Sequence, residues 1–194
     1  MTKKLTLMSI LTAIALIIFI IESLIPIPIP IPGIKLGLAN AVTLFALFLV
    51  RQNNQAEQKN QTEQTLPLKQ TKITQIYYLS TLNVFAILLC RILLGALFTG
   101  RMTAFILSLS GGILAFLAQV LLKRLVTNKQ IWALGAVGAV FHNIGQILAA
   151  IIITGTPAIV TYLPILIIAG IITGSITGLV AQMTLHRITQ NYKK

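Results

Sequence analysis

Aspartate is absent from this 194-residue sequence, and only Glu22, Glu57 and Glu63 supply negatively charged side chains. This shortage excludes aspartate-based catalytic triads, aspartate-rich magnesium motifs and carboxylate-rich metal cages. The single cysteine, Cys90, excludes an intramolecular disulfide and any CxxC site. His142 has no second His, Cys or Asp near it in the sequence, so we expect neither a metal ion nor another cofactor.

Charged residues of either sign make up only 9% of the chain, whereas 56% is hydrophobic and the mean hydropathy is +0.91. This composition is too apolar for a water-exposed surface and predicts an all-α integral membrane protein. Six membrane spans of about 20 residues each would use about 120 residues and leave little more than loops. We therefore expect one domain over residues 1–194. The net charge of +12 does not indicate nucleic-acid binding, because the basic residues lie between apolar runs.

Six apolar runs are long enough to predict membrane spans. They cover residues 5–25, 34–50, 76–98, 102–122, 131–154 and 159–185. The first is longer than the apolar part of a signal peptide and predicts an uncleaved helix. With both termini in the cytoplasm, twelve of the 15 Lys and Arg residues lie in cytoplasmic segments, as the positive-inside rule requires. The sequence therefore predicts a six-helix bundle in the cytoplasmic membrane.

Two segments do not fit a helix. Residues 51–75 are rich in Gln, Asn and Thr, which predicts a flexible cytoplasmic linker. In residues 26–33 proline alternates with isoleucine, which predicts an extended strip. That strip is either a stiff connector or an apolar lid over an outward-facing cavity.

Charged side chains at membrane depth are the first candidates for a binding site. Arg91 lies deep in its run and needs a partner, and Glu22 is the one carboxylate at that depth, so we expect a Glu22–Arg91 pair unless Glu22 is an exposed interfacial residue. Lys35 and Arg101 are either interfacial charges or part of the same site. Together with Arg91 they place an excess of positive charge on the outer side, against the topology rule, which favours an anionic or acceptor-rich ligand.

Small and polar residues share one face of the run 131–154 at three- and four-residue spacing. They are Gly135, Gly138, His142, Gly145, Gln146 and Ala149. This face is expected to point into the bundle. His142, Asn143 and Gln146, with Asn40 of an earlier run, either hydrogen-bond a ligand or join neighbouring helices.

Two further patterns favour close helix packing. Gly170, Gly174 and Gly178 form a tandem GxxxG face, which we expect to pack within the bundle. Ser9 and Ala13 form a small-xxx-small pair on the first run, which either packs within the bundle or docks onto a partner membrane protein.

Three blocks carry a family resemblance. They are IPGIKLGLANAVTLFALFL at 31–49, CRILLGALFTGRMTAFILSLSGGILAF at 90–116 and GAVGAVFHNIGQILAAIIITGTPAIVTYLPILIIAGIITG at 135–174. They resemble the small bacterial membrane family described both as heptaprenyl diphosphate synthase component I and as the Gx transporter family. That family is in turn similar to S components of energy-coupling-factor transporters, and the glutamine-rich insert at 51–75 departs from its compact pattern.

The resemblance implies a six-helix protein that binds a vitamin-like ligand near its outer face. It also implies docking on an energising module of a membrane T component and ATPases, for which Ser9 and Ala13 partly match the docking pattern. No GxxxxGK[ST] motif is present, so energy must come from a partner. Prenyl diphosphate synthases of the usual kind hold magnesium with two aspartate-rich motifs, so this chain is not expected to be an enzyme.

We therefore predict the substrate-binding membrane subunit of a small-molecule transporter. The alternative is a non-catalytic membrane accessory of isoprenoid or quinone metabolism. The predicted ligand-binding residues are Glu22, Lys35, Asn40, Arg91, Arg101, His142, Asn143 and Gln146, with Glu22 orienting Arg91.

Overall fold

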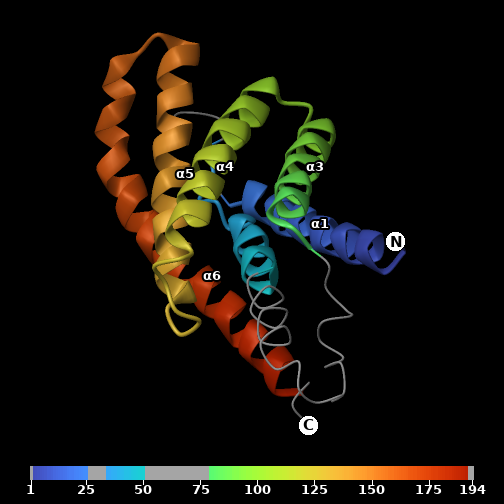
Figure 1. The fold of residues 1–194 in the computed structure, drawn as a ribbon. Helices are drawn as coiled ribbons and strands as arrows, with labels where there is room; N and C mark the ends of the chain where they lie inside the picture. Colours follow the sequence, from blue (N-terminus) through green and yellow to red (C-terminus); the bar gives the residue numbers. More distant parts are fainter. Residues whose placement is uncertain (1, 26–33, 51–78, 192–194) are drawn as a thin grey trace, which may run out of the picture.

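The structure, a computed structural model, describes residues 2–25, 34–50 and 79–191, and their regular structure is helical (Figure 1). Five helical segments in this part are long and apolar enough to cross a membrane. They comprise α1 (Thr2–Ser23), α3 (Thr81–Thr99), α4 (Met102–Leu122), α5 (Ile131–Thr154) and α6 (Leu163–Asn191), the last preceded by the 3-10 helix η1 (Pro157–Tyr162). The all-helical membrane architecture is confirmed, whereas the count of six crossings stays a prediction.

Helix boundaries follow local sequence signals at several ends. The Ser80 side chain accepts a hydrogen bond from the Asn83 N–H and caps the start of α3. Gly100 and Gly155 end α3 and α5 in the left-handed conformation, which glycine adopts without a Cβ clash. Both α4 and α5 have the bounds expected from their apolar runs.

The predicted helical run 34–50 is wrong at its start. Within the described residues the helix there covers Asn40–Val50, a stretch shorter than a span, and residues 34–37 are not helical. Gly37 has a φ of +81°, which interrupts a right-handed helix. Hydrogen bonds from distant residues, described below, hold this segment. The linker predicted at 51–75 and the strip predicted at 26–33 lie outside the described residues.

Close packing of α5 against α4 and α6 forms one half of the bundle. A Cβ added at Gly174 would lie 2.8 Å from Ala136 Cα, and one added at Gly145 would lie 2.9 Å from Gly111 Cα. Since backbones come this near only without side chains between them, glycines set both helix spacings. The expected packing of the α6 glycines within the bundle and the inward direction of the α5 small-residue face are confirmed.

The other half of the bundle consists of α1, α3 and the helix Asn40–Val50. In the view of Figure 1, α1 runs across the direction of α4 and α5. It packs against α3, and its buried Leu11 and Ala15 join Val42 and Leu88 in one apolar cluster. The polar side chains described next lie where these two halves meet.

Candidate functional site

Six buried polar side chains interact with one another across five parts of the fold. They are Glu22 of α1, Lys35 of the segment before the short helix, Asn40 at that helix's start, Arg91 of α3, and His142 and Gln146 of α5. None is more than 6% exposed. We call them the polar cluster. All six were predicted as site residues from the sequence, and the structure brings them together.

Glu22 anchors the segment between α1 and the short helix. Its Oε1 accepts hydrogen bonds from the backbone N–H groups of Gly37 and Leu38, the second at 3.1 Å. The same carboxylate attracts Lys35 and Arg91 electrostatically. Two backbone donors and two nearby cations reduce the cost of burying this charge, but burial remains the largest contribution.

Lys35 ties the same segment to α5 and α1. Its backbone N–H donates to Gln146 Oε1 at 3.1 Å. Its Nζ lies 3.1 Å from the centroid of the Phe19 ring and donates to the Phe19 carbonyl at 3.4 Å. The ammonium therefore combines a cation–π contact with a hydrogen bond.

Arg91 contacts Asn40 across the interface of α3 and the short helix. Its Nη2 donates to Asn40 Oδ1 at 3.4 Å. Within the described residues, neither Arg91 Nε nor Asn40 Nδ2 has a hydrogen-bond partner, although both atoms are buried. Each is an N–H donor, so this pair offers unused donors to an acceptor.

Hydrogen bonds around Gln146 indicate which ring nitrogen of neutral His142 carries the proton. Gln146 Oε1 accepts from the Lys35 backbone, so Gln146 Nε2 is the amide donor that faces His142 Nε2 at 3.0 Å. The neutral imidazole then carries its proton on Nδ1. That atom lies beside the backbone of Gly111.

Among the described residues, close packing surrounds Gly37, and a small hollow lies beside Asn40. A hollow of about 10 Å³ borders Asn40 and Gln119, which is room for about one water molecule. A Cβ on Gly37 would lie 2.9 Å from His142 Cδ2, so the backbone at Gly37 rests on the imidazole ring.

Two predicted site residues lie apart from the polar cluster. Asn143 is fully buried, and its Nδ2 donates to the Leu166 carbonyl at 2.6 Å, so it joins α5 to α6. Arg101 is exposed at the start of α4 and acts on Lys35 only electrostatically. The predicted docking pair Ser9 and Ala13 is exposed on α1.

Sequence reasoning missed Gln119 and Ser108, two buried polar residues of α4. Gln119 Nε2 packs against Gly138, and its Oε1 has no partner in the described part of the chain. A glutamine inside a long apolar run was the available signal, because polar side chains in membrane helices usually face the protein interior.

Comparisons with known proteins give one result. No curated protein and no solved structure matches the chain. A family model described as heptaprenyl diphosphate synthase component I matches residues 11–57 and 70–184, which is most of the chain. This match confirms the family expected from the sequence blocks. The chain belongs to the heptaprenyl diphosphate synthase component I family.

Proposed function

We propose that the chain is the substrate-binding membrane subunit of a small-molecule transporter, with an anionic or acceptor-rich ligand held by the polar cluster. One observation carries this proposal. Arg91 Nε and Asn40 Nδ2 are buried donors without partners among the described residues, on side chains already bonded to each other. Each unsatisfied buried donor costs about 1–3 kcal/mol, and a ligand with acceptor oxygens offsets that cost.

The local charge favours the same class of ligand. Lys35, Arg91 and Arg101 are three cations whose fields overlap, and Glu22 is the carboxylate that acts on the first two of them. The three buried residues Lys35, Arg91 and Glu22 carry a net positive charge in a part of the bundle where water is scarce. An anion entering there gains from both charge and hydrogen bonding.

Binding in the polar cluster requires residues 34–38 to move, because Gly37 rests on His142. By the positive-inside rule this end of the bundle faces outward, with both termini in the cytoplasm. We propose that the ligand enters from that side. Transport then needs an energising partner, for which the exposed Ser9 and Ala13 are the proposed docking positions.

A thermal-shift screen of the purified protein against vitamins and isoprenoid diphosphates tests this function. We expect one class to raise the melting temperature and Asn40→Leu to abolish that rise. Asn83→Leu is the matched control, because Asn83 Nδ2 is also buried without a partner in the described residues but lies near the start of α3, remote from Arg91. A ligand shift that survives Asn40→Leu unchanged contradicts the proposal.

The family description favours a second candidate, a non-catalytic accessory of heptaprenyl diphosphate metabolism. The lack of aspartate argues against catalysis by this chain alone. In this role residues 51–75 would contact a soluble synthase. Deleting them should then abolish the accessory function, whereas ligand capture by the polar cluster should persist.

A further inference from the structure

The small hollow beside Asn40 lies where the short helix Asn40–Val50 meets α4, α5 and α6. Gly37, Asn40, Gln119 and Thr177 are among the residues that line it. Its volume of about 10 Å³ is enough for one water molecule. Asn40 belongs to the polar cluster, whereas Gln119 and Thr177 come from α4 and α6, which contribute no side chain to that cluster. The hollow therefore connects the polar cluster to two further helices.

Asn40 presents a hydrogen-bond donor to the hollow. Its Oδ1 accepts from Arg91 Nη2, and because a guanidinium has only donors, the other end of the amide is the NH2 group. That nitrogen, Nδ2, is buried without a hydrogen-bond partner among the described residues. It lies 3.1 Å from the position of a Cβ added at Gly37, and Gly37 lines the hollow. The unused donor is therefore on the hollow side of Asn40.

Gln119 brings an acceptor to the same hollow. The side chain is 1% exposed, and its Oε1 is buried with no partner in the described part of the chain. Its Nε2 faces Gly138, a residue outside the lining of the hollow, so Oε1 is the amide atom left for the hollow.

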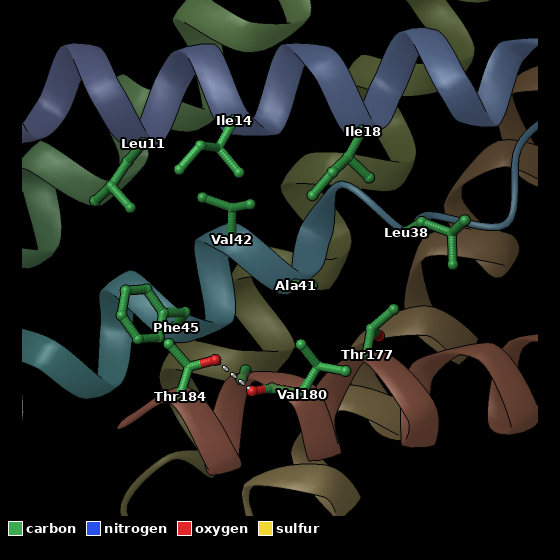
Figure 2. Close-up of a pocket in the computed structure, with 11 residues that line it drawn as sticks. Leu11, Ile14, Ile18, Leu38, Ala41, Val42, Phe45, Thr177, Val180 and Thr184 are labelled. Atoms are coloured by element: carbon green, nitrogen blue, oxygen red, sulfur yellow. Dashed lines mark hydrogen bonds between the residues drawn. The ribbon is translucent and has the colours of Figure 1, made fainter. Parts of the chain in front are cut away.

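Thr177 of α6 supplies a second acceptor. Its Oγ1 donates to the Thr173 carbonyl at 2.9 Å, so the oxygen lone pairs remain for a donor in the hollow. Ala41 and Thr177 also border the larger apolar groove between α1, the short helix and α6 that Figure 2 shows. These two residues therefore lie between the hollow and the groove, and Ala41 adds only hydrocarbon. The hollow thus combines one unused donor with two acceptors.

This combination selects water over an ion. A cation would meet the NH2 group of Asn40 and the positive field of Arg91, and an anion would meet two oxygen atoms. Water accepts from Asn40 and donates to both oxygens, so one molecule satisfies all three groups. We propose that the hollow is a buried water site that bridges Asn40 to Gln119 and Thr177.

The bridge makes Gln119 a positioning residue for the polar cluster. Through the water its carboxamide holds Asn40 Nδ2, which keeps Asn40 Oδ1 turned toward Arg91. The water site belongs to the protein without ligand, so it does not depend on the function proposed above. A ligand that reaches Asn40 Nδ2 displaces the water, whereas Arg91 Nε is an unused donor in either state.

A crystal or electron-microscopy structure of the full-length protein without ligand tests the site directly. We expect density for one water within about 3.2 Å of both Asn40 Nδ2 and Gln119 Oε1. Gln119→Met keeps the length of the side chain without its hydrogen-bonding groups, and we expect it to remove that density while the helices stay in place. A direct Asn40–Gln119 bond, or no density in the hollow of a map that shows other buried waters, overturns the proposal.

A double-mutant cycle measures the bridge in detergent solution, again without ligand. Gln119→Met and Asn40→Leu should each raise the equilibrium constant for unfolding by about tenfold. The double variant should raise it by less than the product of these effects, because the second substitution removes the group that the first left unpaired. Effects that multiply would show that the two side chains share no water.

A second cycle covers the case in which Asn40→Leu does not fold. It combines Gln119→Met with Thr177→Val, which removes the second acceptor with little change of shape. Thr173→Val is the matched control, because Thr173 precedes Thr177 by one turn of α6, donates within that helix in the same way and does not line the hollow. We expect coupling of Gln119 to Thr177 and none to Thr173. Equal coupling to both threonines contradicts the bridge.

Discussion

Glu22 has two separable roles, as a hydrogen-bond acceptor and as a charge. Its Oε1 accepts from the backbone of Gly37 and Leu38, while its charge attracts Lys35 and Arg91. The acceptor role fixes the conformation of the backbone before the short helix. The charge role lowers the electrostatic cost of burying two cations.

Substitution at Glu22 separates these roles. Glu22→Gln keeps an oxygen that can accept both backbone bonds, whereas Glu22→Leu leaves two buried N–H groups without their acceptor. We expect Glu22→Leu to lower the free energy of unfolding by about 1–3 kcal/mol more than Glu22→Gln does. Thermal or chemical unfolding in detergent measures this difference. Equal losses would show that only the charge contributes to stability.

At the residue scale, the sequence was a good guide to which polar side chains are buried. It was a poorer guide to which helix each of them points toward. The apolar surroundings of Arg91, His142 and Gln146 were sufficient to place them in the interior. Asn143 follows His142 directly and therefore points about 100° away around the helix, toward α6. Its contact with α6 depends on which helix packs there, and no local pattern contains that information.

At the scale of elements, the backbone conformation of the segment before the short helix is determined by tertiary contacts. Ile34, Leu36 and Leu38 fit an apolar helical run, yet residues 34–37 are not helical. Bonds to Glu22 and Gln146 hold them instead. These partners are distant in sequence, which explains why periodicity gave the wrong helix start. By contrast, an apolar run followed by Gly155 sufficed to bound α5.

Two glycines with positive φ allow the effect of tertiary contacts on stability to be separated from that of backbone strain. Gly37 has φ +81° and Gly100 has φ +62°, so an added Cβ strains the backbone at both. At Gly100 nothing lies within 4 Å of that Cβ, whereas at Gly37 it meets the His142 ring. We expect Gly37→Ala to cost about 1–3 kcal/mol more than Gly100→Ala, because overpacking adds to the strain.

Unfolding of both glycine variants in the same detergent gives the comparison. A ligand-induced melting shift, once a ligand is known, adds a second readout, since Gly37→Ala also disturbs the backbone that rests on His142. Equal destabilisation by the two variants would mean that the protein accommodates the new methyl group, and that residues 34–38 are less tightly held than their contacts indicate.

At the scale of the whole molecule, the distribution of basic residues predicts orientation. The turn between α4 and α5 contains Lys123, Arg124 and Lys129, whereas the turn between α5 and η1 contains no charged residue. With 24 residues, α5 is about 36 Å long at about 1.5 Å per residue and exceeds a hydrocarbon core of about 30 Å. We therefore expect the two turns to lie on opposite sides of the membrane.

Cysteine labelling on intact cells tests this orientation. Cys90 is the only cysteine, so Cys90→Ser gives a background without thiols. To it we add either Asn128→Cys, exposed in the turn between α4 and α5, or Ala158→Cys, exposed in η1 just after the other turn. We expect a membrane-impermeant maleimide to label Ala158→Cys directly and Asn128→Cys only after permeabilisation. The reverse pattern would place the polar cluster at the cytoplasmic end and contradict ligand entry from outside. Labelling of both from one side would show that α5 does not cross, because its two ends would then share one face of the bilayer.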